Sequence, residues 1–321
     1  MLDPMQWAHY PMGPSLRGYL NIDDRAYLGE SSPRPNEQEA ERFSEALIDH
    51  FTVQPIASTN QWIDIVEELT AMSLSRVAIF LAEEDFREDA KGDFRSALAI
   101  GCSYMLEERF DAALGFLIEA QEAEPEEPAS YVNIASVYYA QKQDQRAKEW
   151  LLAGLDVDAN HKRLWELLAS ILLHADKSSA GDMLRQIGTE KQSYLGLSLA
   201  ADFLEPQDPM FKAELLDDLY ASLAEPDADF LVEYTAALGM AQRFEQIPTV
   251  VWKAQNIAGT SLPWKLHAHV VQAHMAMENL DEASASLATL KRCQDVSEET
   301  LKALEQAIEE EREYLSEAPK S

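Results

Sequence analysis

The chain has 321 residues, and its 57 acidic side chains against 26 basic ones give a formal net charge of −31. Such a surface repels phosphate backbones and anionic membranes, because binding them requires clustered Lys and Arg, so we expect neither nucleic acid nor membrane as a partner. Two cysteines, Cys102 and Cys293, argue against a disulfide framework. No segment approaches the roughly 20 apolar residues that span a bilayer. A cytoplasmic protein is therefore expected.

Residues 1–35 differ in composition from the rest of the chain. Prolines and glycines recur in this segment, so no long helix is expected there. Its aromatic side chains, among them Trp7, Tyr10 and Tyr27, are nevertheless too apolar for an ordinary flexible tail. We expect an extended arm that docks either onto the chain's own body or onto a partner.

Residues 36–93 are expected to form helices ahead of a repeated region. Between residues 36 and 51, Phe43, Leu47 and Phe51 belong to one apolar stripe at helical spacing. Residues 62–86 indicate one or two further apolar helices. These segments would be N-terminal capping helices or a divergent repeat.

Residues 94–294 repeat a pattern with a spacing of 34 residues, in which small, aromatic, small, large and small residues recur in register. Two successive copies are Gly101, Tyr104, Ala113, Leu117 and Ala120, and then Ala135, Tyr138, Ala147, Leu151 and Gly154. About six units are expected, clear in the first two and the last and degenerate between them. The third begins near Lys162, with Ala180, Leu184 and Ile187 in its second helix. Asp217, for example, stands where a large apolar residue is expected.

Residues 295–321 are expected to form an acidic capping helix and tail. Ser297 can N-cap a helix whose Leu301, Leu304 and Ile308 share one face, while glutamates fill much of the remaining surface. A polar outer face at the end of a repeat array prevents further stacking.

The spacing of 34 residues resembles the tetratricopeptide repeat, a helix-turn-helix unit in which small residues let two antiparallel helices touch. The resemblance implies an all-α fold, a right-handed α-solenoid with capping helices at both ends. It also implies a concave groove that holds other proteins and is lined by the first helix of each unit. It indicates no particular partner, because the motif specifies only size and polarity at a few positions.

The residues that the resemblance places on the groove are mostly small or apolar. The expected protein-binding residues are Arg95, Leu98, Cys102, Met105, Val132, Asn133, Ser136, Tyr139, Arg163 and Leu173. The resemblance also places Leu106 on the inner wall of the first unit. We expect the hot spots at the large side chains of Leu98, Met105 and Tyr139, because such anchors supply most binding energy. An alternative is that the N-terminal arm or neighbouring helices partly cover this wall.

The wall departs from that of the chaperone-binding subgroup, which clamps a carboxylate with Lys and Asn at the positions held here by Leu98 and Cys102. We therefore expect no such clamp. The groove would accept apolar side chains of an extended or helical segment, with Asn133 and Ser136 bonding to its backbone. In this it is similar to bacterial secretion chaperones of the repeat class, which are shorter chains.

We expect no catalytic residue, no cofactor and no metal. Asp156 and Asp158 begin a calcium-loop pattern, but Leu167 stands where the loop needs a glutamate. Neither a phosphate-binding loop nor a zinc-type cysteine pattern occurs. Three histidines of one predicted helix do not have the spacing of three or four residues that a shared metal requires: His267, His269 and His274.

These features predict a non-enzymatic adaptor or scaffold that binds a partner segment in the groove. Its rear half would be a second surface, with a wall made acidic by Asp202, Glu205, Asp229 and Glu233. The alternative is a dedicated cytoplasmic chaperone of a secreted or assembling client, for which the groove alone matters. An enzyme is the third class considered. The sequence does not specify the oligomeric state.

Overall fold

The computed structural model describes residues 7, 10–22, 35–84, 90–176, 179–258 and 262–317. Seventeen α-helices lie in these residues, and none of the residues described is in a strand. The predicted all-α class is therefore confirmed. The chain divides into two compact units, Met1–Ile171 and Leu172–Ser321, which are described separately below.

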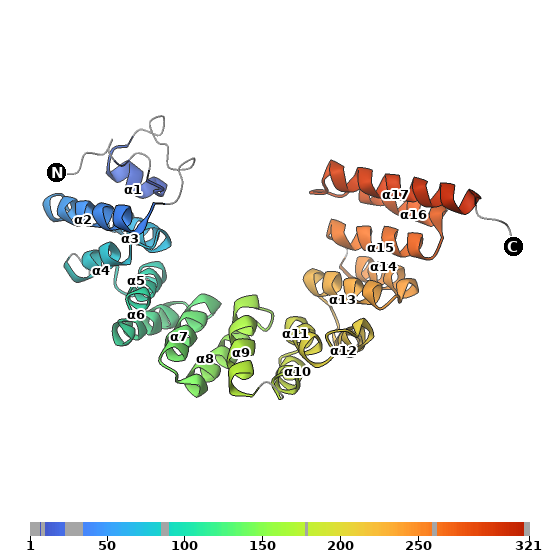
Figure 1. Ribbon diagram of the computed structural model, residues 1–321, viewed down its shortest axis with the longest axis horizontal. Helices are drawn as coiled ribbons and strands as arrows, with labels where there is room; N and C mark the ends of the chain where they lie inside the picture. The colour runs from blue at the N-terminus through green and yellow to red at the C-terminus, as the bar shows by residue number, and fades with distance from the viewer. Residues whose placement is uncertain are drawn as a thin grey trace. The chain divides into compact units, whose positions relative to one another are not determined.

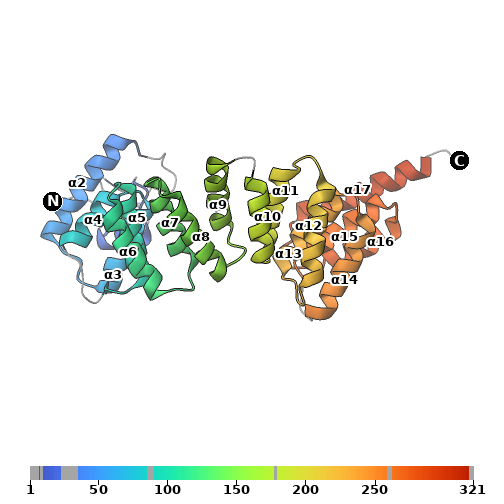
Figure 2. The same ribbon diagram turned by 90° about the horizontal axis from the view of Figure 1, so that it is seen from below.

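The first unit is built from helices that pack mainly on their neighbours in sequence. α5 pairs with α6 and α7 with α8, α6 packs on α7, and α3 contacts both α4 and α5 (Figures 1 and 2). The helices are α1 (Pro14–Tyr19), α2 (Glu37–Val53), α3 (Thr59–Ala71), α4 (Ser75–Glu84), α5 (Phe94–Leu106), α6 (Phe110–Ala123), α7 (Pro128–Ala140), α8 (Asp144–Val157) and most of α9 (Lys162–Ala175).

The second unit follows the same principle. Each helix from α10 to α13 contacts the next, and α15 contacts α13, α14, α16 and α17. The helices are α10 (Ala180–Glu190), α11 (Tyr194–Leu204), α12 (Pro209–Ser222), α13 (Ala228–Met240), the 3-10 turn η4 (Phe244–Gln246), α14 (Ile247–Ala258), α15 (Trp264–Ala276), α16 (Leu280–Leu290) and α17 (Glu298–Glu317).

Small residues allow the paired helices of the first unit to approach closely. A Cβ atom on Gly101 of α5 would lie 2.7 Å from the Leu117 side chain of α6 and 3.2 Å from its backbone nitrogen. The turns between paired helices are correspondingly tight, and Glu108 and Lys142 adopt left-handed φ angles of 57° and 60° in them. The small residues of the repeated sequence pattern thus lie where the helices touch.

The middle of the chain pairs its helices differently from the expected repeat boundaries. The sequence pattern assigned α10 to the second half of a unit that begins at Lys162, but α10 packs most closely on α11. Gln192, in the turn between them, has a left-handed φ of 51°, as in the other tight turns. A Cβ atom on Gly188 would lie 2.9 Å from the backbone nitrogen of Leu197, so the glycine permits this pairing.

The described part of the N-terminal segment packs onto the first unit. The carboxylate of Glu68, on α3, accepts hydrogen bonds from the backbone nitrogens of Ser15 and Leu16, each at 2.9 Å. These are first-turn amides of α1, which have no partner inside their own helix. Tyr10 packs its ring 4.2 Å from that of Phe43, centroid to centroid. Of the expected arm, residues 1–6, 8–9 and 23–34 lie outside the described residues.

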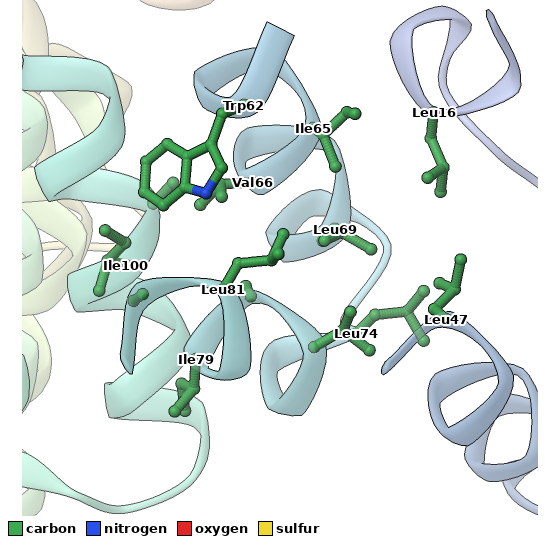
Figure 3. Packing of buried hydrophobic residues seen from close by; sticks show 14 of the residues in the cluster. Leu16, Leu47, Trp62, Ile65, Val66, Leu69, Leu74, Ile79, Leu81 and Ile100 are labelled. Carbon is green, nitrogen blue, oxygen red and sulfur yellow. The ribbon is translucent and has the colours of Figure 1, made fainter. Parts of the chain in front are cut away.

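The core of the first unit is continuous from the N-terminal segment to the first helix pair. Figure 3 shows Leu16 of α1 on the side of the core formed by Leu47, Ile65 and Leu69, all fully buried. At the opposite side of the same view, Trp62 and Val66 of α3 face Ile100 of α5. The residues before 94 therefore complete the hydrophobic core on which α5 rests.

A polar cluster explains the unexpected aspartate in the middle of the chain. Asp217 of α12 accepts a hydrogen bond of 2.6 Å from the hydroxyl of Tyr234 on α13 and forms an ion pair of 2.7 Å with Arg243. Burial, and then the bond to Asp217, raise the pKa of Tyr234 above its ordinary value. The aspartate thus joins α12 to α13 in place of an apolar contact.

Replacing Gly101 by alanine is expected to destabilise the first unit, because the new methyl group would collide with Leu117. The expected loss is about 1–3 kcal/mol of unfolding free energy. Gly115, on α6, has open space around its Cβ position. There, Gly115→Ala is expected to stabilise the protein by roughly 0.5–1 kcal/mol through the unfolded chain. Urea unfolding followed by circular dichroism measures the unfolding free energy of both variants. Equal changes in Gly101→Ala and Gly115→Ala would contradict the close approach of α5 and α6.

Replacing Glu68 by alanine is expected to release the N-terminal segment from the first unit. The change leaves two backbone amides of α1 without their charged acceptor, at a cost of about 1.5–3 kcal/mol. Amide hydrogen exchange at residues 14–20 should accelerate, while exchange in α5 and α6 changes little. Glu45→Ala, an exposed site on α2, is the control. Unchanged exchange in residues 14–20 would show that the carboxylate does not hold this segment.

The Tyr234 cluster is expected to make the second unit sensitive to alkaline pH. Because folding raises the pKa of this hydroxyl, its stabilising effect is complete below pH 10.0, the ordinary value, and is lost as the pH rises beyond it. Tyr234→Phe should lower the unfolding free energy by about 1–2 kcal/mol at neutral pH. In this variant the unfolding free energy should also decrease less as the pH rises above about 10. Tyr314→Phe is the control, because Tyr314 is 69% exposed. An unchanged alkaline decline in Tyr234→Phe would argue against the cluster.

Candidate functional site

The expected groove residues of the first unit lie on two neighbouring helices. α5 carries Leu98, Cys102 and Met105 at spacings of four and three, so these side chains share one face of the helix. α7 carries Asn133, Ser136 and Tyr139 at successive spacings of three, so these side chains also share one face. α5 and α7 are in contact, and we call the surface formed by these six residues and Leu106 the α5–α7 wall.

The apolar residues of the α5–α7 wall are only partly covered. Leu98, Cys102 and Met105 are half-buried and pack against the core of the first unit, and Tyr139 is also half-buried. Leu106, at the end of α5, is 53% exposed. Val132 differs, because it is only 8% exposed and thus lies mainly in the core. The expectation that Val132 lines an open groove is corrected in this respect.

Arg95 is occupied by contacts within the first unit. Its guanidinium lies 2.8 Å from the carboxylate of Asp64 and forms a second, shorter ion pair with Glu67, both on α3. The hydrogen bonds to Glu67 and Asp64 raise the pKa of Arg95. Because its charge already has two partners, Arg95 links α3 to α5 and is a poor anchor for a partner's carboxylate.

The polar residues of the wall bond to their own helix. Asn133 donates from its side-chain nitrogen to the carbonyl of Ala129 at 2.9 Å, and the Ser136 hydroxyl donates to that of Val132 at 2.8 Å. The single hydroxyl proton of Ser136 is therefore engaged within α7. The Asn133 amide has a second N–H, and both side chains have an oxygen that can accept a hydrogen bond from a partner's backbone.

The two remaining predicted residues belong to α9. Arg163 of α9 is exposed and interacts with Glu166 of its own helix at 3.3 Å. Leu173 belongs to the second unit. The structure thus brings together residues of α5 and α7, whereas Leu173 is outside that set.

Burial favours the protonated form of the Cys102 thiol. Burial raises its pKa to about 11. The thiolate is the nucleophilic form of cysteine, so at neutral pH Cys102 contributes to the wall as a small apolar side chain.

The expected acidic rear wall is partly neutralised. Glu233 of α13 forms an ion pair of 2.7 Å with Lys212 of α12 and accepts a hydrogen bond of 3.1 Å from Ser198 of α11. This carboxylate therefore joins three consecutive helices. Asp202, Glu205 and Asp229 are exposed, as expected of acidic surface residues.

Sequence reasoning placed no site between α15 and α17, where the structure has a hollow of about 570 Å³. His269 lines it and forms a hydrogen bond of 2.8 Å with Thr235 of α13. Burial, and then the nearby Lys265, lower the pKa of His269. The signals in the sequence that could have indicated this surface were Trp264, at the start of α15, and His269, in the same helix.

The described part of the chain contains no group of three or more His, Cys, Asp or Glu side chains placed to hold a metal ion. Among its helices, none has the length and apolar character needed to cross a bilayer.

Solved structures that align with the chain do so at low identity. A tetratricopeptide repeat protein from Parabacteroides merdae aligns over 92% of this chain and 100% of its own, with 12% identity and a TM-score of 0.38. The PilF protein of Pseudomonas aeruginosa aligns over 68% of this chain and 98% of its own, with 16% identity and a TM-score of 0.34.

The Cut9–Hcn1 hetero-tetramer of APC/C aligns over 84% of this chain, with 10% identity and a TM-score of 0.37, and this chain covers 52% of the aligned chain. Scores this small support no conclusion about partners. No curated protein matches the sequence. The family model described as tetratricopeptide repeat matches residues 104–171, which include the pair α7–α8 and its neighbours. Residues 104–171 are thus similar to the tetratricopeptide repeat.

Proposed function

We propose that this protein is an adaptor that binds a segment of a partner protein on the α5–α7 wall. The observation that carries the proposal is the incomplete burial of apolar side chains along that wall, where Leu106 is 53% exposed and Leu98, Met105 and Tyr139 are half-buried. Apolar area of this kind gains free energy when a partner removes it from water. The net charge of −31 disfavours nucleic acid and anionic lipid, which supports a protein as the partner.

Binding at this wall would depend mainly on apolar burial. Asn133 and Ser136 already donate to their own helix, so few side-chain donors remain for a partner's backbone. Leu98, Met105 and Tyr139 would act as anchors, since large buried side chains carry most of the binding energy at interfaces. The helices that present them are held by close pairing, so the surface is preformed and loses little entropy on binding.

The second unit favours an adaptor over a dedicated chaperone. A chaperone of one client would need the α5–α7 wall alone, whereas the second unit has an apolar hollow of its own between α15 and α17. Two surfaces on separate units suit a protein that joins two partners. The proposal assigns no chemical reaction to either surface.

Replacing Leu106 by serine is expected to weaken the partner of the α5–α7 wall without destabilising the protein. The side chain is already half in water, so its removal costs the fold little, but it removes apolar area from the interface. With Leu106→Ser/Tyr139→Ala, recovery of that partner should fall by about tenfold or more. The measurement is affinity capture from the native host with quantitative mass spectrometry.

The matched control for this experiment is Val53→Ser. Val53 is an apolar residue of the same unit that is 71% exposed and lies on α2, away from the wall. Circular dichroism should show both variants folded. If the two variants recover the same proteins in the same amounts, the wall is not the binding surface.

A further inference from the structure

The hollow between α15 and α17 lies entirely within the second unit. Its walls are mainly apolar, with Trp264 and Ala268 from α15 facing Ala303 and Leu304 from α17. α17 is the last described helix, and it packs on both α15 and α16. The hollow therefore forms where the terminal helix covers α15 incompletely.

A second hollow of about 360 Å³ continues the first. It lies between α13, α14 and α15 and shares His269 and Gln272 with the hollow beside α17. Along α15 the joined surface runs from Trp264 to Ala273, which is roughly 14 Å at the rise of an α-helix. Met240, 56% exposed, lines the second hollow. We call this joined surface the α15 groove.

The interior of the α15 groove carries little charge. Among the described residues that line it, the charged side chains are Lys265 and Glu299, one of each sign. His269 is held by Thr235, and burial lowers its pKa, so the ring is neutral at physiological pH. An apolar side chain can enter without displacing a buried charge, and a cationic segment meets no imidazolium.

Acidic side chains dominate the surface beside the groove. α17 exposes Glu299, Glu310 and Glu313, and Glu299 lines the hollow itself. On the side of α17 that faces α16, Glu305 forms an ion pair with Lys291, and Arg312 pairs with both Glu309 and Asp281. This field, with the net charge of −31, attracts basic residues and repels acidic ones.

We propose that the α15 groove binds an apolar segment of a second protein whose flanking residues are Lys or Arg. Apolar side chains of the segment would fill the hollows beside Trp264 and Met240, and its basic residues would face the glutamates of α17. The inference rests on the proposed role in protein binding but concerns a different surface and a different unit.

Synthetic peptides test the proposal directly. The probe is a fluorescent peptide of about 14 residues, roughly 21 Å long as a helix, with Leu and Ala on one face and Lys on the other. One comparison peptide has Glu in place of each Lys, and another has Ser in place of each Leu. Fluorescence anisotropy at physiological salt measures the dissociation constants, with the full-length chain as the receptor.

Two variants fill the groove from opposite walls, Ala303→Trp from α17 and Gln272→Trp from α15. Both residues are exposed, so the larger side chain does not enter the core. The control is Ala285→Trp, at an exposed position of α16 that does not line either hollow. We expect Ala303→Trp and Gln272→Trp to weaken binding of the Leu–Lys peptide by about tenfold and the control by less than about twofold.

The comparison peptides should each bind at least about tenfold more weakly than the Leu–Lys peptide. Equal binding of the Ser peptide would overturn the proposal, since charge alone would explain the affinity. Equal binding of the Glu peptide would overturn it as well, and so would unchanged affinity in both groove-filling variants. The variant Leu106→Ser/Tyr139→Ala should bind the Leu–Lys peptide normally. Suppose that this variant loses the partner of the α5–α7 wall in affinity capture, while the wild-type protein does not bind the Leu–Lys peptide. That result would refute the α15 groove and leave the proposed function of the wall intact.

Discussion

The close approach of two antiparallel helices is the constraint on which the rest of this structure depends. Gly101 leaves space for Leu117, and Gly188 lets the backbone of α11 reach α10. Where the helices touch at this distance, the connecting turns are short, and residues such as Glu108 and Gln192 adopt left-handed conformations. The cost of those turns is offset by burial of the apolar faces on each side.

This way of packing also determines where binding surfaces can occur. A helix that packs mainly on its sequence neighbours buries two sides and leaves a third for solvent or a partner. In the first unit that third side carries Leu98, Met105 and Tyr139, and in the second it carries Trp264 and Gln272. Polar contacts such as Asp217 with Tyr234, and Arg95 with Asp64, hold neighbouring helices in place without covering these sides. Both candidate surfaces are largely apolar, and the α15 groove in addition has exposed glutamates of α17 beside it.

Helix content and the positions of the first two helix pairs could be predicted from the sequence, because the pattern depends on residue size at fixed spacing. The groove residues could be predicted only in part. Leu98, Met105 and Tyr139 lie on one wall, but Val132 is 8% exposed, and Arg95 is engaged by α3. Which side of a helix is covered depends on the helices before and after it. The repeat pattern does not specify the contacts of a divergent neighbour such as α3.

The sequence by itself determined that this protein is all-helical, acidic and built from repeated helix pairs, because these properties follow from composition and from contacts over short sequence separations. Only the tertiary structure decided that α10 pairs with α11, that Glu68 holds α1, and that a groove forms along α15. Each of these features joins side chains or backbone groups from different helices. Their energies depend on distance and burial, which residue types and spacing do not specify.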